Sequence, residues 1–248
     1  MGLSNSKNIN INEDKLHIVT FNSTSNVSNY NNNVITNFVN NFIDKNVIFT
    51  LQGIDADIKF NEKFNYFYSK ELKLGILTNL NIITSCSMIY KQNYHNINTL
   101  NYGYQIIETQ FNKINLNIYN TELIPNITDE FNTKAIRQSQ VYEILKYICE
   151  NKRDKKFHLV TGCFYDSKKF KEMISISDIN NIITNLESGR QDNYIFIYSE
   201  SLVENLNKLN EYLKENFNIF VVKQNIYNLE INQHCPFETI LSIENLKN

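Results

Sequence analysis

Short runs of alternating apolar and polar residues recur along this chain, and such runs predict β-strands. The strands are expected at residues 16–21, 47–51, 66–68, 74–77, 82–87, 105–111, 114–119, 157–160, 194–198, 219–222 and 237–243. Apolar residues at helical spacing predict helices at residues 34–43, 134–150 and 202–217, and a Ser/Asp cap predicts a short helix at residues 177–185. Short turns between the strands from residue 66 to residue 119 indicate one antiparallel meander.

The order of these elements predicts one domain of mixed α/β type. Residues 1–14 are polar and are expected to form a flexible arm. Residues 15–248 are expected to form a single domain, because no linker, repeat or shift in composition divides them. The apolar fraction of 42% is ample for a core, since a chain of this length buries roughly 70% of its unfolded surface on folding.

The charge balance argues against a nucleic-acid-binding surface. The formal net charge is -2 and the pI is about 6.1, whereas phosphate binding normally requires a stripe of lysines and arginines. The longest basic run, at residues 152–156, is interpreted as a solvated loop. Nucleic acid is therefore not expected among the partners.

Cysteine usage and hydropathy bear on the cellular location. The four cysteines, Cys86, Cys149, Cys163 and Cys235, are far apart, form no CxxC pair and follow no secretory segment. A reduced, cytoplasmic environment is therefore expected. No run of about 18 apolar residues is present, so no membrane-spanning segment is expected. Abundant Asn, Ile, Lys and Tyr are typical of an AT-rich genome, such as that of a virus or a protist.

The first residues carry a lipidation signal. Gly2 follows the initiator methionine and Ser6 stands four residues later, which fits the pattern for N-myristoylation of Gly2. The same spacing also arises by chance in serine-rich termini. One myristoyl chain binds a membrane with a constant on the order of 10⁴ M⁻¹. We therefore expect reversible, peripheral attachment to the cytoplasmic face of an intracellular or plasma membrane, or attachment completed by a partner.

Short motifs follow the predicted elements in a fixed order. They are Asn22 after the first strand, Leu51-Gln52-Gly53, Leu74-Gly75-Ile76-Leu77, Asn120-Thr121-Glu122-Leu123, Arg137 with Gln140, Gly162-Cys163-Phe164-Tyr165, Asp192-Asn193-Tyr194-Ile195-Phe196, and Asn232-Gln233-His234-Cys235-Pro236. This order resembles the endonuclease/exonuclease/phosphatase superfamily over residues 16–243. The resemblance implies a DNase I-like α/β (α+β) fold: a four-layer sandwich of two mixed β-sheets packed face to face and flanked by helices.

The resemblance also implies a site whose chemical groups have been replaced. Members of this superfamily hydrolyse phosphoesters with a hard divalent cation, which requires carboxylate ligands. The positions of the degenerate pocket are Asn22, Gly53, Glu122, Cys163, Tyr165, Gln233 and His234. The metal-binding Glu is replaced by Gly53, the water-activating Asp by Cys163, and the Asp that pairs with the catalytic His by Gln233. We therefore predict a pseudoenzyme that binds no metal or other cofactor.

Three other interpretations of the pocket remain. Asp55, Asp57, Glu122 and Asp166 lie near the expected mouth and could rebuild a site for a metal-dependent nuclease, sphingomyelinase or inositol-phosphate phosphatase, although Asp55, Asp57 and Asp166 also suit turns. Cys163, His234 and Cys235 could bind zinc, but their spacing is not a recognised zinc pattern. Binding of a lipid headgroup or inositol phosphate would require basic residues near Asn22 and His234 that the sequence does not place.

The replacement function is expected to be that of a membrane-associated binding or scaffold protein with a protein partner. Aromatic residues assigned to loops could contribute contacts, although such residues more often belong to the core. They are Tyr66, Phe67, Tyr68, Tyr102 and Tyr104. His17 is expected to serve packing rather than catalysis, and the sequence leaves the oligomeric state open.

Overall fold

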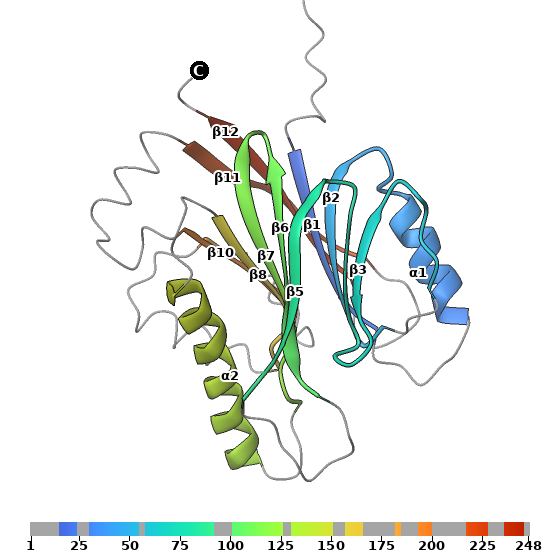
Figure 1. The fold of residues 1–248 in the computed structure, drawn as a ribbon. Coiled ribbons are helices and arrows are strands. Elements are labelled where there is room, and N and C mark those ends of the chain that lie inside the picture. Colours follow the sequence, from blue (N-terminus) through green and yellow to red (C-terminus); the bar gives the residue numbers. More distant parts are fainter. Residues whose placement is uncertain are drawn as a thin grey trace, which may run out of the picture.

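In the computed structural model the chain forms two six-stranded sheets that pack face to face, with helix α1 beside one sheet and helix α2 beside the other (Figure 1). The structure describes residues 15–23, 30–54, 58–91, 101–125, 130–150, 157–165, 182–184, 193–199, 217–227 and 236–245. Within these ranges, no helix is long and apolar enough to cross a membrane.

The first sheet has the strand order β11-β12-β1-β2-β4-β3. Its elements are β1 (Lys15–Asn22), β2 (Asn46–Gln52), β3 (Asn65–Ser69), β4 (Leu74–Thr78), β11 (Phe217–Ile226) and β12 (Phe237–Asn245), with α1 at Tyr30–Asn40. Strands β1 and β2 are parallel, and their neighbours are antiparallel to them. The parallel pair requires a crossover, which α1 supplies on the outer face of the sheet.

The second sheet has the strand order β5-β6-β7-β8-β10-β9. Its elements are β5 (Ile82–Ile89), β6 (Gly103–Phe111), β7 (Ile114–Glu122), β8 (Phe157–Cys163), β9 (Ile182–Thr184) and β10 (Asn193–Ser199), with α2 at Glu130–Glu150. Here β7 and β8 are the parallel pair, and α2 is the crossover between them. Each sheet is therefore mixed, and each contains one parallel pair joined through a helix.

Three apolar layers hold the sandwich together, because alternate residues of each strand face opposite sides of its sheet. The layer between the sheets contains Leu16, Ile18, Ile48, Ile76, Ile107, Leu116, Ile118, Leu159 and Leu241. The layer under α1 contains Val19, Phe21, Val47, Phe49, Leu51 and Leu77, with Ile35, Phe38 and Val39 from the helix and Phe42 from the turn after it. The layer under α2 contains Tyr104, Ile106, Tyr119 and Val160, with Val141, Ile144 and Ile148 from the helix.

The strands expected from alternation are confirmed, but the expected meander is wrong. Strand β4 pairs with β2 and β3 in the first sheet, whereas β5 pairs with β6 in the second. The chain thus passes from one sheet to the other at residues 79–81. The short helix expected at residues 177–185 is also wrong where it can be compared, since β9 lies there and pairs with β10. The helix expected at residues 202–217 lies outside the described residues except for Phe217, which begins β11.

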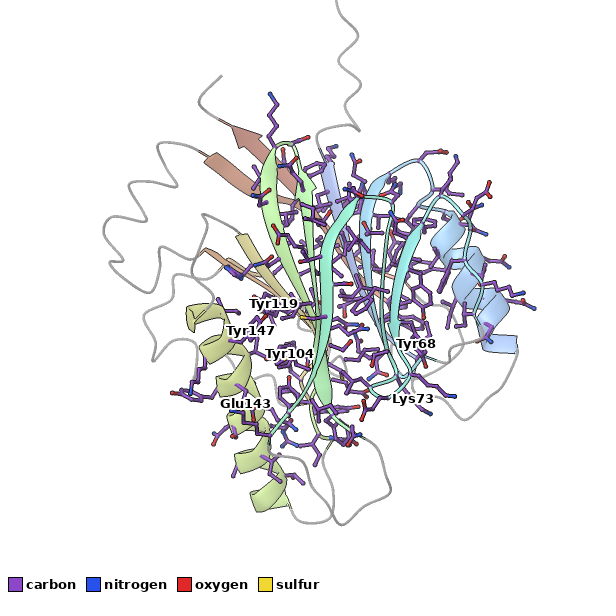
Figure 2. All side chains as sticks on the ribbon, in the orientation of Figure 1. Tyr68, Lys73, Tyr104, Tyr119, Glu143 and Tyr147 are labelled. Atoms are coloured by element: carbon purple, nitrogen blue, oxygen red, sulfur yellow. The ribbon has the colours of Figure 1, made fainter. Side chains whose placement is uncertain are left out.

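The aromatic residues considered as a contact surface belong mainly to strands, as the strand predicted at residues 66–68 implies for three of them. Tyr66, Phe67 and Tyr68 lie in β3 and Tyr104 in β6, while Tyr102 directly precedes β6. Tyr104 is buried between α2 and the second sheet (Figure 2), and the other four pack partly buried against one of the three layers. These rings contribute to the core rather than to a contact surface.

A buried polar cluster joins β1 to the carboxyl-terminal strands. The Nδ1 atom of His17 lies 2.6 Å from the Oε1 atom of Glu238, and both residues are buried. Asn225 and Tyr227 donate hydrogen bonds to the other carboxylate oxygen. The His17 ring also meets the edge of Phe42 under α1, at 6.1 Å between ring centroids. His17 therefore has a packing role, as expected.

Candidate functional site

The candidate site lies at one end of the layer between the two sheets, called the inner layer below, where apolar side chains give way to polar ones. In β1, Leu16 and Ile18 face the second sheet, so Asn22 at the end of the strand projects to the same side. In β7, Ile118 faces the first sheet, and Glu122 therefore does so as well. The carboxyl ends of the two parallel pairs meet here, since Asn22 is in register with Gln52 and Glu122 with Cys163.

A layer of buried amides forms the floor of this site. The Nε2 atom of Gln52 donates to the Oδ1 atom of Asn120 at 2.7 Å. The Nδ2 atom of Asn120 donates in turn to the backbone oxygens of Leu51 and Gly75, both at 3.0 Å. Gln52 and Asn120 are fully buried. Because Asn120 belongs to the second sheet and its acceptors to the first, this amide connects the two sheets directly.

Glu122 lies at the centre of a hydrogen-bonded cluster with Asn22 and Tyr165. The Tyr165 hydroxyl donates to the Oε1 atom of Glu122 at 2.7 Å. The Nδ2 atom of Asn22 donates to the same oxygen at 3.3 Å and to the Tyr165 oxygen at 3.5 Å. The structure therefore brings together three of the positions that the motifs single out. Their polar groups form hydrogen bonds to one another.

The electrostatic environment of the cluster favours neutral groups. Burial raises the pKa of the Glu122 carboxyl, although hydrogen bonds from Tyr165 and Asn22 and the charge of Lys73 oppose the increase. Burial also raises the pKa of the Tyr165 hydroxyl, and Cys163 and Glu122 act in the same direction. Tyr165 therefore keeps its proton at neutral pH and remains a donor to Glu122.

Gly53 occupies the position where the resemblance expects a metal-binding glutamate. Its φ of 63° lies in the left-handed region, which costs a residue with a Cβ atom roughly 1–2 kcal/mol. Its backbone oxygen accepts a hydrogen bond from the Ser23 hydroxyl at 2.9 Å. The backbone at this position therefore suits glycine and would strain a glutamate.

The donor set of the described residues does not fit a Mg²⁺ ion. Magnesium requires hard oxygen ligands in octahedral geometry, and Glu122 supplies the one carboxylate of this cluster, already bonded to Asn22 and Tyr165. Cys163 is fully buried and offers a soft sulfur. In the part of the chain that the structure describes, no group of three or more His, Cys, Asp or Glu residues is arranged to hold a metal.

Several predicted site residues lie outside the described residues. They are Gly2, Asp55, Asp57, Asp166, Gln233, His234 and Cys235. The expected myristoylation, the rearranged metal site and the zinc alternative depend on these residues and remain predictions.

Sequence reasoning missed two contributors to the site. Asn120 opens the Asn120–Leu123 motif but was not assigned a role, and its sheet-bridging bonds connect residues up to 69 positions apart. Lys73, just before β4, lies close enough to lower the pKa of Glu122. Lys73 is a basic residue near the Glu122 cluster, and no motif in the sequence identifies it as part of the site.

The expected scaffold contacts of α2 are present. The Nη1 atom of Arg137 donates to the backbone oxygen of Ile124 at 3.2 Å. The Oε1 atom of Gln140 accepts from the backbone nitrogen of the same residue at 3.1 Å. These bonds fix the middle of α2 to the segment that follows Glu122. The helix therefore holds one wall of the site in place.

Comparison with solved structures gives the class of this fold. A humanised D. rerio TDP2 carrying 14 mutations has a TM-score of 0.63 at 12% identity, covering 92% of this chain and 99% of that chain. SmcL gives 0.62 at 12% identity, covering 92% and 99%. An endonuclease/exonuclease/phosphatase family protein from Leptotrichia buccalis C-1013-b gives 0.61 at 10% identity, covering 92% and 99%.

The chain therefore has the DNase I-like fold of the endonuclease/exonuclease/phosphatase superfamily, and the fold predicted from its motifs is confirmed. No protein-family model matches the sequence, and no curated protein matches it. At 10–12% identity, the structural likeness shows the fold alone.

Proposed function

We propose that this protein is a catalytically inactive relative of the DNase I-like phosphoesterases that acts as a membrane-associated binding or scaffold protein. The observation that carries the proposal is the contact between Tyr165 and Glu122. The tyrosine hydroxyl donates to the carboxylate at 2.7 Å, at the end of the inner layer where the motifs would place metal and water. The Oε1 atom of Glu122 therefore already accepts a hydrogen bond from another side chain of the protein.

The backbone at Gly53 supports the same conclusion. A metal-binding side chain is absent there, and the left-handed conformation disfavours its return. The floor of the site is held by the neutral amides of Gln52 and Asn120. Hydrolysis of a phosphoester by metal-ion catalysis needs a bound metal and an activated water, and the carboxyl group of Glu122 in this cluster already accepts hydrogen bonds from Tyr165 and Asn22.

The test is a hydrolysis assay beside a thermal-shift titration with Mg²⁺ and with Mn²⁺. We expect no turnover of a chromogenic phosphodiester or phosphomonoester and no metal-dependent rise in Tm. A site with a Kd of about 1 mM would add about 1.4 kcal/mol at about 10 mM metal, or roughly 3–6 °C in Tm. The matched control is Glu122→Gln, which should give the same null titration as the wild type.

The opposite result would identify the alternative phosphoesterase. Metal-dependent turnover that Asp55→Asn, Asp57→Asn or Asp166→Asn abolishes would mean that displaced acids have rebuilt a metal site. Turnover that Glu122→Gln abolishes would place the chemistry in the Tyr165 cluster. Either outcome would end the proposal of catalytic inactivity.

The membrane part of the proposal rests on Gly2 and Ser6, which fit the myristoylation pattern. Expression in a eukaryotic host should give an intact mass with one myristoyl increment, and Gly2→Ala should remove it. The modified protein should sediment with phosphatidylcholine vesicles more than the Gly2→Ala variant does. An unmodified terminus would remove the membrane attachment and leave the proposal of inactivity untouched.

A further inference from the structure

Strand β5 forms an exposed, uncharged edge of the second sheet. No described strand pairs with its outer side. Of the four large apolar side chains that the described residues expose, three lie on this strand: Ile83 (50% exposed), Met88 (39%) and Ile89 (45%). No charged residue occurs from residue 79 to residue 90. Unpaired backbone groups and exposed apolar side chains together make this edge a template for another strand.

The other edge strands carry the features that normally prevent such pairing. Strand β11 has the exposed Lys223, and β3 and β9 are only five and three residues long. Lysine and short length are both protections against edge-to-edge association. In β5 the one protective feature is an irregularity between Ile82 and Thr84. It leaves the remainder of an eight-residue strand in regular register.

The residue types along β5 are arranged nearly symmetrically about the middle of the strand. Apolar residues stand at each end, with Ile82 and Ile83 at one and Met88 and Ile89 at the other, and small residues fill the middle. Two antiparallel copies would therefore bring apolar ends together and place the small residues at the centre, Ser85, Cys86 and Ser87, against one another. Like charges near the two-fold axis would repel each other across the pairing, and this strand carries no charged residue.

We propose that β5 pairs antiparallel with β5 of a second copy of this chain, about a two-fold axis near the middle of the strand. Ile83 and Ile89 lie three residues on either side of Cys86. An axis at Cys86 therefore places Ile83 of one copy opposite Ile89 of the other. The pairing would join the two second sheets into one continuous sheet. A two-fold contact is closed, so association stops at the dimer. This inference goes beyond the proposed loss of catalysis and does not depend on it.

Sedimentation velocity over roughly 1–300 µM is the first measurement, because a contact along a single strand is small and its dissociation constant is high. The mass should rise from 29.2 kDa towards twice that value. Hydrogen exchange should show that amides of residues 82–89 gain protection over the same concentration range.

Two lysine variants separate this edge from general apolar association. Ile89→Lys places a charge on β5 and should keep the protein monomeric at every concentration, while its far-ultraviolet spectrum stays native. Tyr142→Lys removes the fourth large exposed apolar side chain among the described residues, on α2 and 62% exposed, and should dimerise as the wild type does. Should Ile89→Lys not fold, Ser87→Lys at another exposed position of the strand replaces it.

A wild type that stays monomeric at the highest concentration would overturn the proposal. So would a dimer that Tyr142→Lys dissociates and Ile89→Lys does not, since the contact would then involve α2. A dimer whose β5 amides gain no protection would also contradict it.

Discussion

Replacement of Asn120 by alanine tests whether the buried amide layer holds the two sheets together. This side chain makes three hydrogen bonds of 3.0 Å or less, to Gln52, Leu51 and Gly75. All three partners lie on the first sheet, whereas Asn120 lies on the second. A buried hydrogen bond contributes about 0.5–1.5 kcal/mol, so loss of the three bonds should cost about 1.5–4.5 kcal/mol. For a chain of this size, 3 kcal/mol lowers Tm by roughly 6–12 °C.

The assay is urea denaturation of Asn120→Ala beside the matched control Asn117→Ala. Asn117 lies on the same strand, three residues earlier, and is partly exposed. We expect the control to change the free energy of unfolding by about 0.5 kcal/mol or less. The midpoint should fall for Asn120→Ala with an unchanged m-value. A cost below about 1 kcal/mol, or equal to that of the control, would refute the role assigned to this amide.

Three further substitutions make predictions of different sign. Burial raises the pKa of Glu122, so its ionisation destabilises the fold as pH rises; Glu122→Gln should gain stability over the wild type at pH 8 but not at pH 4. Although burial alone would raise the pKa of Glu238, hydrogen bonds from His17 and its neighbours lower it. The ionised Glu238 therefore stabilises the fold above about pH 4.5, and this contribution is lost as pH falls. Glu238→Gln should make the free energy of unfolding depend less on pH below about pH 4.5. An unchanged pH dependence would contradict this. Gly162→Ala would place a Cβ atom 1.9 Å from the backbone oxygen of Thr121, at a φ of 136°; a soluble protein with a native Tm would show that this contact is misjudged.

The sequence predicted the strands well because alternation is a local property. In β7, Ile114, Leu116 and Ile118 stand two residues apart, and all three lie in the inner layer. The same rule sends Glu122 to the inner face. The strand predicted at residues 114–119 stops before Glu122, and the structure extends it to that residue.

Alternation does not say which sheet a strand joins. Strands β4 and β5 are separated by residues 79–81, a turn short enough for a hairpin, and the sequence favoured a meander. The structure places the two strands in different sheets, because β4 completes the layer under α1 while β6 buries Tyr104 under α2. The residues of the turn itself do not show which of these layers each strand will complete.

By itself, then, the sequence determined the fold class and the succession of strands along the chain, and it singled out the positions of the candidate site. The tertiary structure decided what those positions do now. Asn22, Glu122 and Tyr165 are separated by 100 and 43 residues, and only the packing of two sheets brings their side chains within hydrogen-bonding distance. The exposure of β5 is also a tertiary property, since a strand becomes an edge only when the rest of the sheet has been assembled without it.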